Sequence, residues 1–130
     1  MKLHKYDQIS STPLVYLPKT AAEAFDVGEG VVITAGKATK VGATVKPTYI
    51  CMGVSAAADT ADIPAIRVNP DMEIGATLTV SGAALNIGDK VTIRTDGIQV
   101  TATTTSGVFE ITGFSTAAKA AGDEVYGRFA

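Results

Sequence analysis

The chain has 130 residues and a formal net charge of −2, and only 18% of its residues are charged, below the roughly one quarter usual for soluble domains. It contains no run of about 18 apolar residues, a polar and charged start, and one cysteine. These features argue against a membrane-spanning helix, a secretory signal, an internal disulfide and a thiolate metal cluster. The weak acidity gives no electrostatic reason to bind nucleic acid or an anionic membrane.

The apolar composition favours strands over helices. Valine and isoleucine together number 23 against five leucines, and there are 17 threonines. Side chains branched at Cβ fit a pleated sheet and lose rotamer freedom in a helix. We therefore expect an all-β protein.

The first 20 residues differ from the rest of the chain. Leu14, Val15, Tyr16 and Leu17 form a short apolar run between Pro13 and Pro18. The prolines favour extended chain, which either packs as an edge strand on its own domain or pairs with another chain as an arm. We predict an extended N-terminal arm over residues 1–20 and a β domain over residues 21–130. The four apolar residues of the run are our candidates for partner contact.

A repeated turn follows the arm. A glycine, an acidic residue, any residue and a valine recur at residues 28–31, 88–91 and 122–125. Glycine supplies a positive φ, the acidic residue lies at the turn, and the valine begins a strand. The first two copies continue into predicted hairpins, 31–34 with 38–41 and 91–94 with 98–100. The residues assigned to turns are Gly28, Gly30, Gly36, Gly88, Asp89, Asp96, Gly97, Gly122 and Asp123.

The remaining alternating segments predict further short strands. They cover residues 48–54, 63–68, 73–80, 108–114 and 125–129, and residues 115–121 have the composition of one helical turn. About seven to nine short strands with frequent turns indicate a compact small β-barrel or β-sandwich of short antiparallel strands. The alternation does not distinguish the barrel from the sandwich.

No catalytic constellation is recognisable. A nucleophile paired with a histidine would have to use His4, near the terminus, or Cys51, inside an apolar segment where a thiol is usually inert. The carboxylates are scattered at turns, without the spacing of a calcium loop. Lys37 lies at a hairpin tip, as the modified lysine of a lipoyl carrier does, but the flanking motif of such carriers is missing. We therefore expect no enzyme activity, no cofactor, no metal and no nucleic-acid or membrane partner.

Four segments resemble the tailed-phage capsid cement, or head decoration, proteins. They are Gly-Glu-Gly-Val-Val-Ile-Thr-Ala-Gly at 28–36, Cys-Met-Gly-Val-Ser-Ala at 51–56, Ile-Thr-Gly at 111–113 and Ala-Ala-Gly-Asp-Glu-Val-Tyr at 120–126. The resemblance implies a non-enzymatic protein, made in the host cytoplasm, that binds the outside of an expanded phage head in the virion. It also implies a homotrimer that bridges subunits of the major capsid protein and stabilises the capsid.

A surface carbohydrate-binding or adhesion module on a β scaffold is the alternative. Sugar sites usually present exposed aromatic side chains, whereas this chain has no tryptophan, four tyrosines and four phenylalanines. The composition therefore favours the capsid protein over the sugar-binding module.

Overall fold

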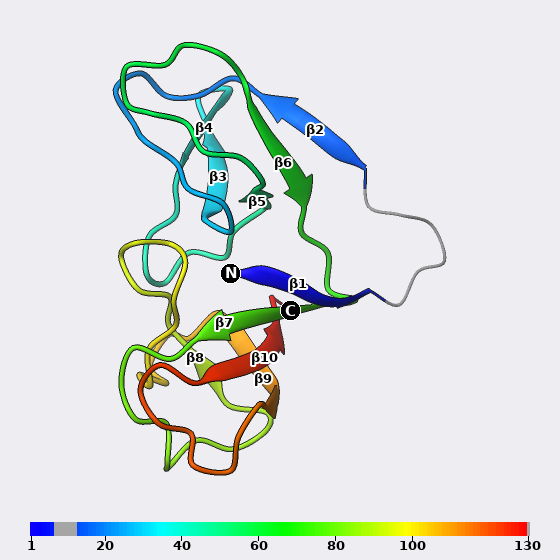
Figure 1. Cartoon of the computed structure of the whole chain (residues 1–130), viewed down its shortest axis with the longest axis vertical. Coiled ribbons are helices and arrows are strands. Elements are labelled where there is room, and N and C mark those ends of the chain that lie inside the picture. The colour runs from blue at the N-terminus through cyan, green and yellow to red at the C-terminus, as the bar shows by residue number, and fades with distance from the viewer. Residues whose placement is uncertain (7–12, 130) are drawn as a thin grey trace.

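A computed structural model describes residues 1–6 and 13–129, which form ten strands and no helix. One five-stranded antiparallel sheet, the upper sheet in Figure 1, has the order β2-β6-β5-β3-β4. The lower sheet, also five-stranded and antiparallel, has the order β1-β7-β10-β9-β8, and the two chain ends lie between the sheets. The upper strands are β2 (Leu14–Leu17), β3 (Gly30–Thr34), β4 (Lys37–Lys40), β5 (Tyr49–Cys51) and β6 (Ile63–Arg67). The lower strands are β1 (Lys2–Tyr6), β7 (Met72–Thr77), β8 (Lys90–Val91), β9 (Phe109–Phe114) and β10 (Glu124–Arg128).

Isolated bridges curl each sheet toward closure. In the upper sheet, Lys19 pairs in parallel with Ala38 and so connects the end of β2 to β4. In the lower sheet, Val100 pairs both with Leu78, after β7, and with Ile93, after β8. The predicted all-β fold of short antiparallel strands is confirmed, with two sheets as in a small β-sandwich and each sheet curled by its bridges.

The two sheets share one topology, so the chain contains an internal structural repeat. Apart from β1, the lower order β7-β10-β9-β8 repeats the upper order β2-β6-β5-β3, and Val100 takes the place of β4. Matching backbone hydrogen bonds recur 60 positions later in the chain. They are Gly28 N to Cys51 O (2.7 Å) with Gly88 N to Ile111 O (2.8 Å), and Thr48 N to Val31 O with Val108 N to Val91 O (both 3.0 Å).

The repeated glycine–acidic turns have one geometry. The glycines Gly28, Gly88 and Gly122 have φ values of 87°, 96° and 91°, which a type II turn requires at its third residue. The following acidic side chain accepts a hydrogen bond from the backbone N–H three residues earlier. These bonds are Asp26 N to Glu29 Oε2 (2.9 Å), Asn86 N to Asp89 Oδ2 (2.8 Å) and Ala120 N to Asp123 Oδ2 (2.8 Å). Each turn therefore directs the chain into a strand, and the next valine (Val31, Val91 or Val125) is fully buried.

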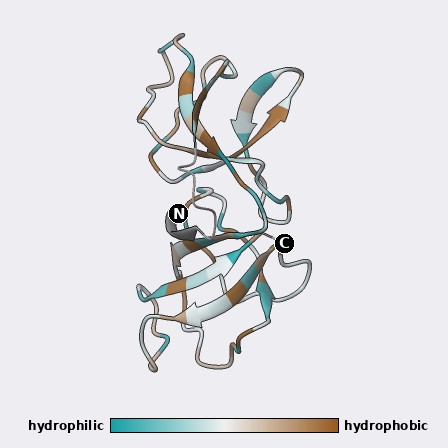
Figure 2. Cartoon of the chain, turned by 90° about the vertical axis from the view of Figure 1, so that its right-hand side faces the viewer, coloured by the Kyte–Doolittle hydropathy of each residue, from teal (hydrophilic) through white to brown (hydrophobic). Residues whose placement is uncertain are grey.

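The larger hydrophobic core joins the two sheets. Val41, Ile50 and Ile66 from the upper half pack in the same cluster as the lower strands β7, β9 and β10. Phe109 and Phe129 meet edge to face in this cluster, with ring centroids 5.3 Å apart. A second cluster, around Phe25 and Cys51, lies within the upper half. Figure 2 shows hydrophobic positions distributed along the strands of both halves.

Three local predictions need correction. Residues 115–121 form turns and bends instead of a helical turn, because Lys119 has a φ of 49° and Asp123 Oδ2 accepts the hydroxyl of Thr116 (2.6 Å). The strand expected over 73–80 ends at Thr77, and Val80 is exposed. In the hairpin expected over residues 91–100, Val91 pairs with Phe109 on β9, and the two arms pair through the bridge between Ile93 and Val100. The turn still closes through Arg94 N to Gln99 O (2.7 Å).

Candidate partner-binding edge

The apolar run predicted to contact a partner forms strand β2 at the edge of the upper sheet. Leu14 pairs with Ile66 and Leu17 with Ile63, both on β6. Leu14 is 53% exposed and Tyr16 is 66% exposed, whereas Val15 and Leu17 are half-buried. As one interpretation of the sequence predicts, β2 is an edge strand that pairs within its own chain. It also presents two large apolar side chains to solvent, so the other interpretation, contact with a partner chain, stays a prediction.

Pro64 determines which backbone groups of β2 point outward. It has no N–H, and its carbonyl accepts the N–H of Met52 on the β5 side (2.9 Å). Alternate residues of a strand direct their polar groups to opposite edges, so Ile63 and Ala65 face β2. Their partners there are Leu17 and Val15. The N–H and C=O groups of Leu14 and Tyr16 therefore point to the outer edge of β2, and no described residue pairs with that edge.

Of the other residues assigned to turns, Gly36, Asp96 and Gly97 shape hairpin turns, whereas Gly30 is the first residue of strand β3 and pairs with Ile50. Gly36 (φ 77°) follows Ala35 (φ 50°) in the two-residue turn between β3 and β4. Positive φ at both positions of such a turn matches the right-handed twist of the two strands that it joins. Asp96 Oδ1 accepts the N–H groups of Ile98 (2.9 Å) and Gln99 (3.1 Å). Gly97 lies at a φ of 73°, and its carbonyl accepts the N–H of Gly30 at the start of β3 (2.8 Å). This last bond links the lower hairpin to the upper sheet.

Sequence reasoning missed the buried position of the first residue. The amine of Met1 donates to the carbonyls of Gly28 (2.7 Å) and Ile98 (3.0 Å), between the two sheets. Burial lowers its pKa to about 6, partly offset by the nearby Asp96 and Glu29 carboxylates. Burial also raises the pKa of Glu29, which is 2% exposed and 3.5 Å from Lys40 Nζ. The local signal for this contact was Gly28, which has no side chain and so leaves room beside its backbone for Met1.

Two buried titratable side chains of the upper half, Cys51 and Lys19, have structural roles. Cys51 is buried, its Sγ lies 3.0 Å from the carbonyl of Gly53, and burial raises the pKa of its thiol. A buried thiol with a raised pKa holds little of the reactive thiolate form. Lys19 is buried as well, and its Nζ donates to Ser55 Oγ (2.9 Å) and to the carbonyl of Ala56 (2.7 Å). This lysine therefore anchors the 55–56 loop.

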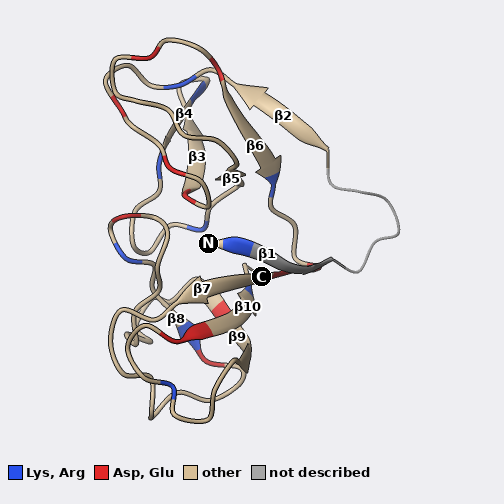
Figure 3. Ribbon diagram, in the orientation of Figure 1, with Lys and Arg blue, Asp and Glu red and all other residues tan. Residues whose placement is uncertain are grey.

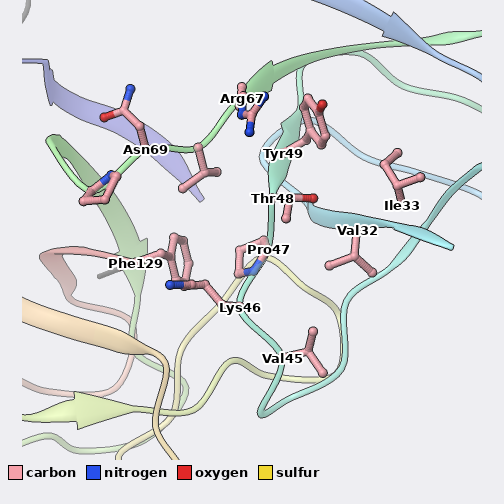
Figure 4. Close-up of a pocket in the computed structure, with 12 residues that line it drawn as sticks. Val32, Ile33, Val45, Lys46, Pro47, Thr48, Tyr49, Arg67, Asn69 and Phe129 are labelled. Carbon is pink, nitrogen blue, oxygen red and sulfur yellow. The ribbon is translucent and has the colours of Figure 1, made fainter. Parts of the chain in front are cut away.

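A pocket of about 590 Å³ lies between β3, the loop around Pro47 and the C-terminal Phe129 (Figure 4). Its walls are mainly apolar, and Lys46 and Arg67 are its charged members. The described residues that line it include no carboxylate, cysteine or histidine, the side chains that most often act as a general base or a metal ligand. Figure 3 shows basic and acidic positions scattered along the described parts of both halves.

No family model matches the chain, and no curated protein matches it. Within residues 1–6 and 13–129, no group of three or more histidine, cysteine or acidic residues is placed to hold a metal ion. The same part of the chain contains no helix long and apolar enough to cross a membrane.

Proposed function

We propose that this protein is a non-enzymatic capsid decoration protein. It binds the outer surface of an expanded phage head and bridges subunits of the major capsid protein, as a homotrimer on the capsid. The resemblance of its turn and strand motifs to head decoration proteins suggests this role, and the surface of the molecule supports it.

The edge of β2 is the observation on which the proposal rests. Leu14 and Tyr16 are exposed on a strand whose outer backbone groups have no described partner. Strand edges of this kind bind proteins through main-chain hydrogen bonds, while the side chains contribute specificity. The scattered charges and the low charged fraction suit a wide protein contact, because the centres of protein interfaces are depleted in charge.

Cosedimentation with expanded, undecorated heads from a panel of tailed phages tests the proposal. We expect saturable binding at a fixed ratio to the major capsid subunit, and heads that withstand higher temperature once decorated. Light scattering on the purified protein tests for a trimer in solution. If the protein pellets with no head in the panel and does not change head stability, the proposal is wrong, and glycan binding becomes the function to test.

A further inference from the structure

The internal repeat identifies a lower-sheet equivalent of β2 and the strand that pairs with the outer edge of that equivalent. The chain after β2 and the chain after β7 make the same pair of backbone hydrogen bonds. In the upper half, Ala38 N donates to Pro18 O (2.7 Å) and Thr20 N to Ala38 O (3.0 Å). In the lower half, Val100 N donates to Thr77 O (3.0 Å) and Thr79 N to Val100 O (2.9 Å).

These bonds align β2 with β7 residue by residue. Pro18 corresponds to Thr77 and Thr20 to Thr79, a shift of 59 positions. Leu14, Val15 and Tyr16 therefore correspond to Glu73, Ile74 and Gly75. The pairing with the neighbouring strand agrees: Val15 pairs with Ala65 on β6, and Ile74 pairs with Gly127 on β10. The outer edges of β2 and β7 are thus the same edge of two copies of one unit.

In the lower sheet this edge is occupied. Strand β1 pairs with it in antiparallel orientation, with Lys2 opposite Gly75, Leu3 opposite Ile74 and Lys5 opposite Glu73. Among residues 1–6 and 13–129, strand β1 has no counterpart in the upper sheet, so it lies outside the repeated unit.

We propose that the outer edge of β2 is a strand-acceptor site for an extended segment of the protein to which this chain binds. The segment lies antiparallel to β2, opposite Leu14, Val15 and Tyr16, in the register that β1 adopts on β7. The backbone of this segment forms hydrogen bonds with the N–H and C=O groups of Leu14 and Tyr16. Identifying the segment as part of the capsid protein rests on the proposed function, whereas the acceptor site follows from the repeat.

The chemistry of the edge describes the segment. Exposed strand edges are usually protected by lysine, proline or a bulge, and β2 has only apolar residues, with Pro13 and Pro18 outside its two ends. The prolines limit the site to about four residues of strand. Cross-strand pairs with Leu14 and Tyr16 favour aromatic or β-branched side chains. The fitting occupant is therefore a short, uncharged extended segment.

A proline substitution tests the main-chain contact. Tyr16→Pro removes an N–H that no described residue accepts, so the bonds of Val15 and Leu17 to β6 remain. Tyr16→Ala removes the side chain and keeps the N–H. Ile87→Pro is the matched control, because Ile87 is 69% exposed at the second position of a type II turn, where proline is favoured. Urea unfolding of all three variants checks that each one folds.

With heads that bind the natural chain, we expect Tyr16→Pro to bind about tenfold more weakly than Tyr16→Ala, because it loses a main-chain hydrogen bond and places a ring at the edge. Ile87→Pro binds as the natural chain does. Equal affinities for folded Tyr16→Pro and Tyr16→Ala overturn the acceptor site and leave the capsid proposal intact.

An acetylated and amidated peptide with the sequence of residues 31–34, Val-Val-Ile-Thr, is short, uncharged and β-branched, and it tests the site without heads. At millimolar concentration it slows amide hydrogen exchange at Leu14 and Tyr16 by about fivefold, the effect of one ordinary hydrogen bond. Val15 and Leu17, already bonded to β6, change little. If exchange at Leu14 and Tyr16 does not slow, the acceptor site is wrong. If it slows while no head is bound, the site stands and the capsid proposal fails.

Discussion

Two equivalent glycines allow a contact between the sheets to be measured separately from backbone strain. Gly28 and Gly88 occupy the same position of the same turn, with φ values of 87° and 96°. A Cβ at Gly88 meets nothing within 4 Å, whereas at Gly28 it would overlap the carbonyl oxygen of Met1 and lie 2.8 Å from the Met1 nitrogen. The substitutions Gly28→Ala and Gly88→Ala therefore share one cost and differ in another.

The shared cost is the strain of alanine at positive φ, about 1–2 kcal/mol. Gly28→Ala also displaces Met1, whose amine makes two hydrogen bonds and whose residue is only 7% exposed. Those bonds contribute about 0.5–1.5 kcal/mol each, and the buried side chain about 1.5–3 kcal/mol. We expect a loss of unfolding free energy of about 1–2 kcal/mol for Gly88→Ala and about 3.5–8 kcal/mol for Gly28→Ala.

Urea unfolding monitored by circular dichroism measures both losses. Gly122→Ala, at φ 91° with nothing within 4 Å, is a second control and matches Gly88→Ala. A domain is stable by only about 5–15 kcal/mol, so Gly28→Ala brings the chain close to unfolding. If Gly28→Ala and Gly88→Ala differ by less than about 1 kcal/mol, well under the expected loss of the Met1 contacts, the packing of Met1 contributes no stability and the reasoning is refuted.

Three further predictions concern buried polar groups. The pKa of the Met1 amine is about 6 in the folded chain against 8.0 ordinarily, so the unfolded chain binds more protons between these values. The unfolding free energy therefore rises from pH 6 to pH 8, by at most about 3 kcal/mol, and acetylating the amine removes this dependence in urea titrations. Cys51 reacts with a disulfide reagent slowly in the native state and rapidly in urea, and equal rates would contradict its burial. Lys19→Met lowers the unfolding free energy by about 1–3 kcal/mol, because Ser55 Oγ and the Ala56 carbonyl lose their donor; adding Ser55→Ala recovers part of the loss in a double-mutant cycle.

The pocket between the sheets contributes to the fold. Its lining includes Phe129, which belongs to the core shared by both sheets, and Val68, which packs against that core. The walls of the pocket thus come from the region where the two halves meet. A substitution in this pocket therefore changes the packing between the two halves as well as any binding in the pocket.

The sequence predicted the features that depend on neighbouring residues. The glycine–acidic pattern predicts the turns, since both the positive φ and the capping carboxylate lie within four residues of chain. The alternation of Phe109 and Ile111 predicts the buried face of β9, because side chains on a strand alternate with a period of two. The prolines around residues 14–17 predict extended chain, because each restricts its own φ and the residue before it.

The tertiary structure decided everything that depends on distant partners. Pro64, remote in sequence from Leu14 and Tyr16, determines that their backbone groups point outward. The pairing of β1 with β7 and the burial of the Met1 amine also join distant segments, and local periodicity does not encode them. Corresponding strand positions of the two halves can carry different side chains, such as Thr48 and Val108 or Cys51 and Ile111, whereas Ile33 and Ile93 are identical. The sequence shows the repeated turns, whereas the repeated strand order and the accessible edge that it identifies appear only in the tertiary structure.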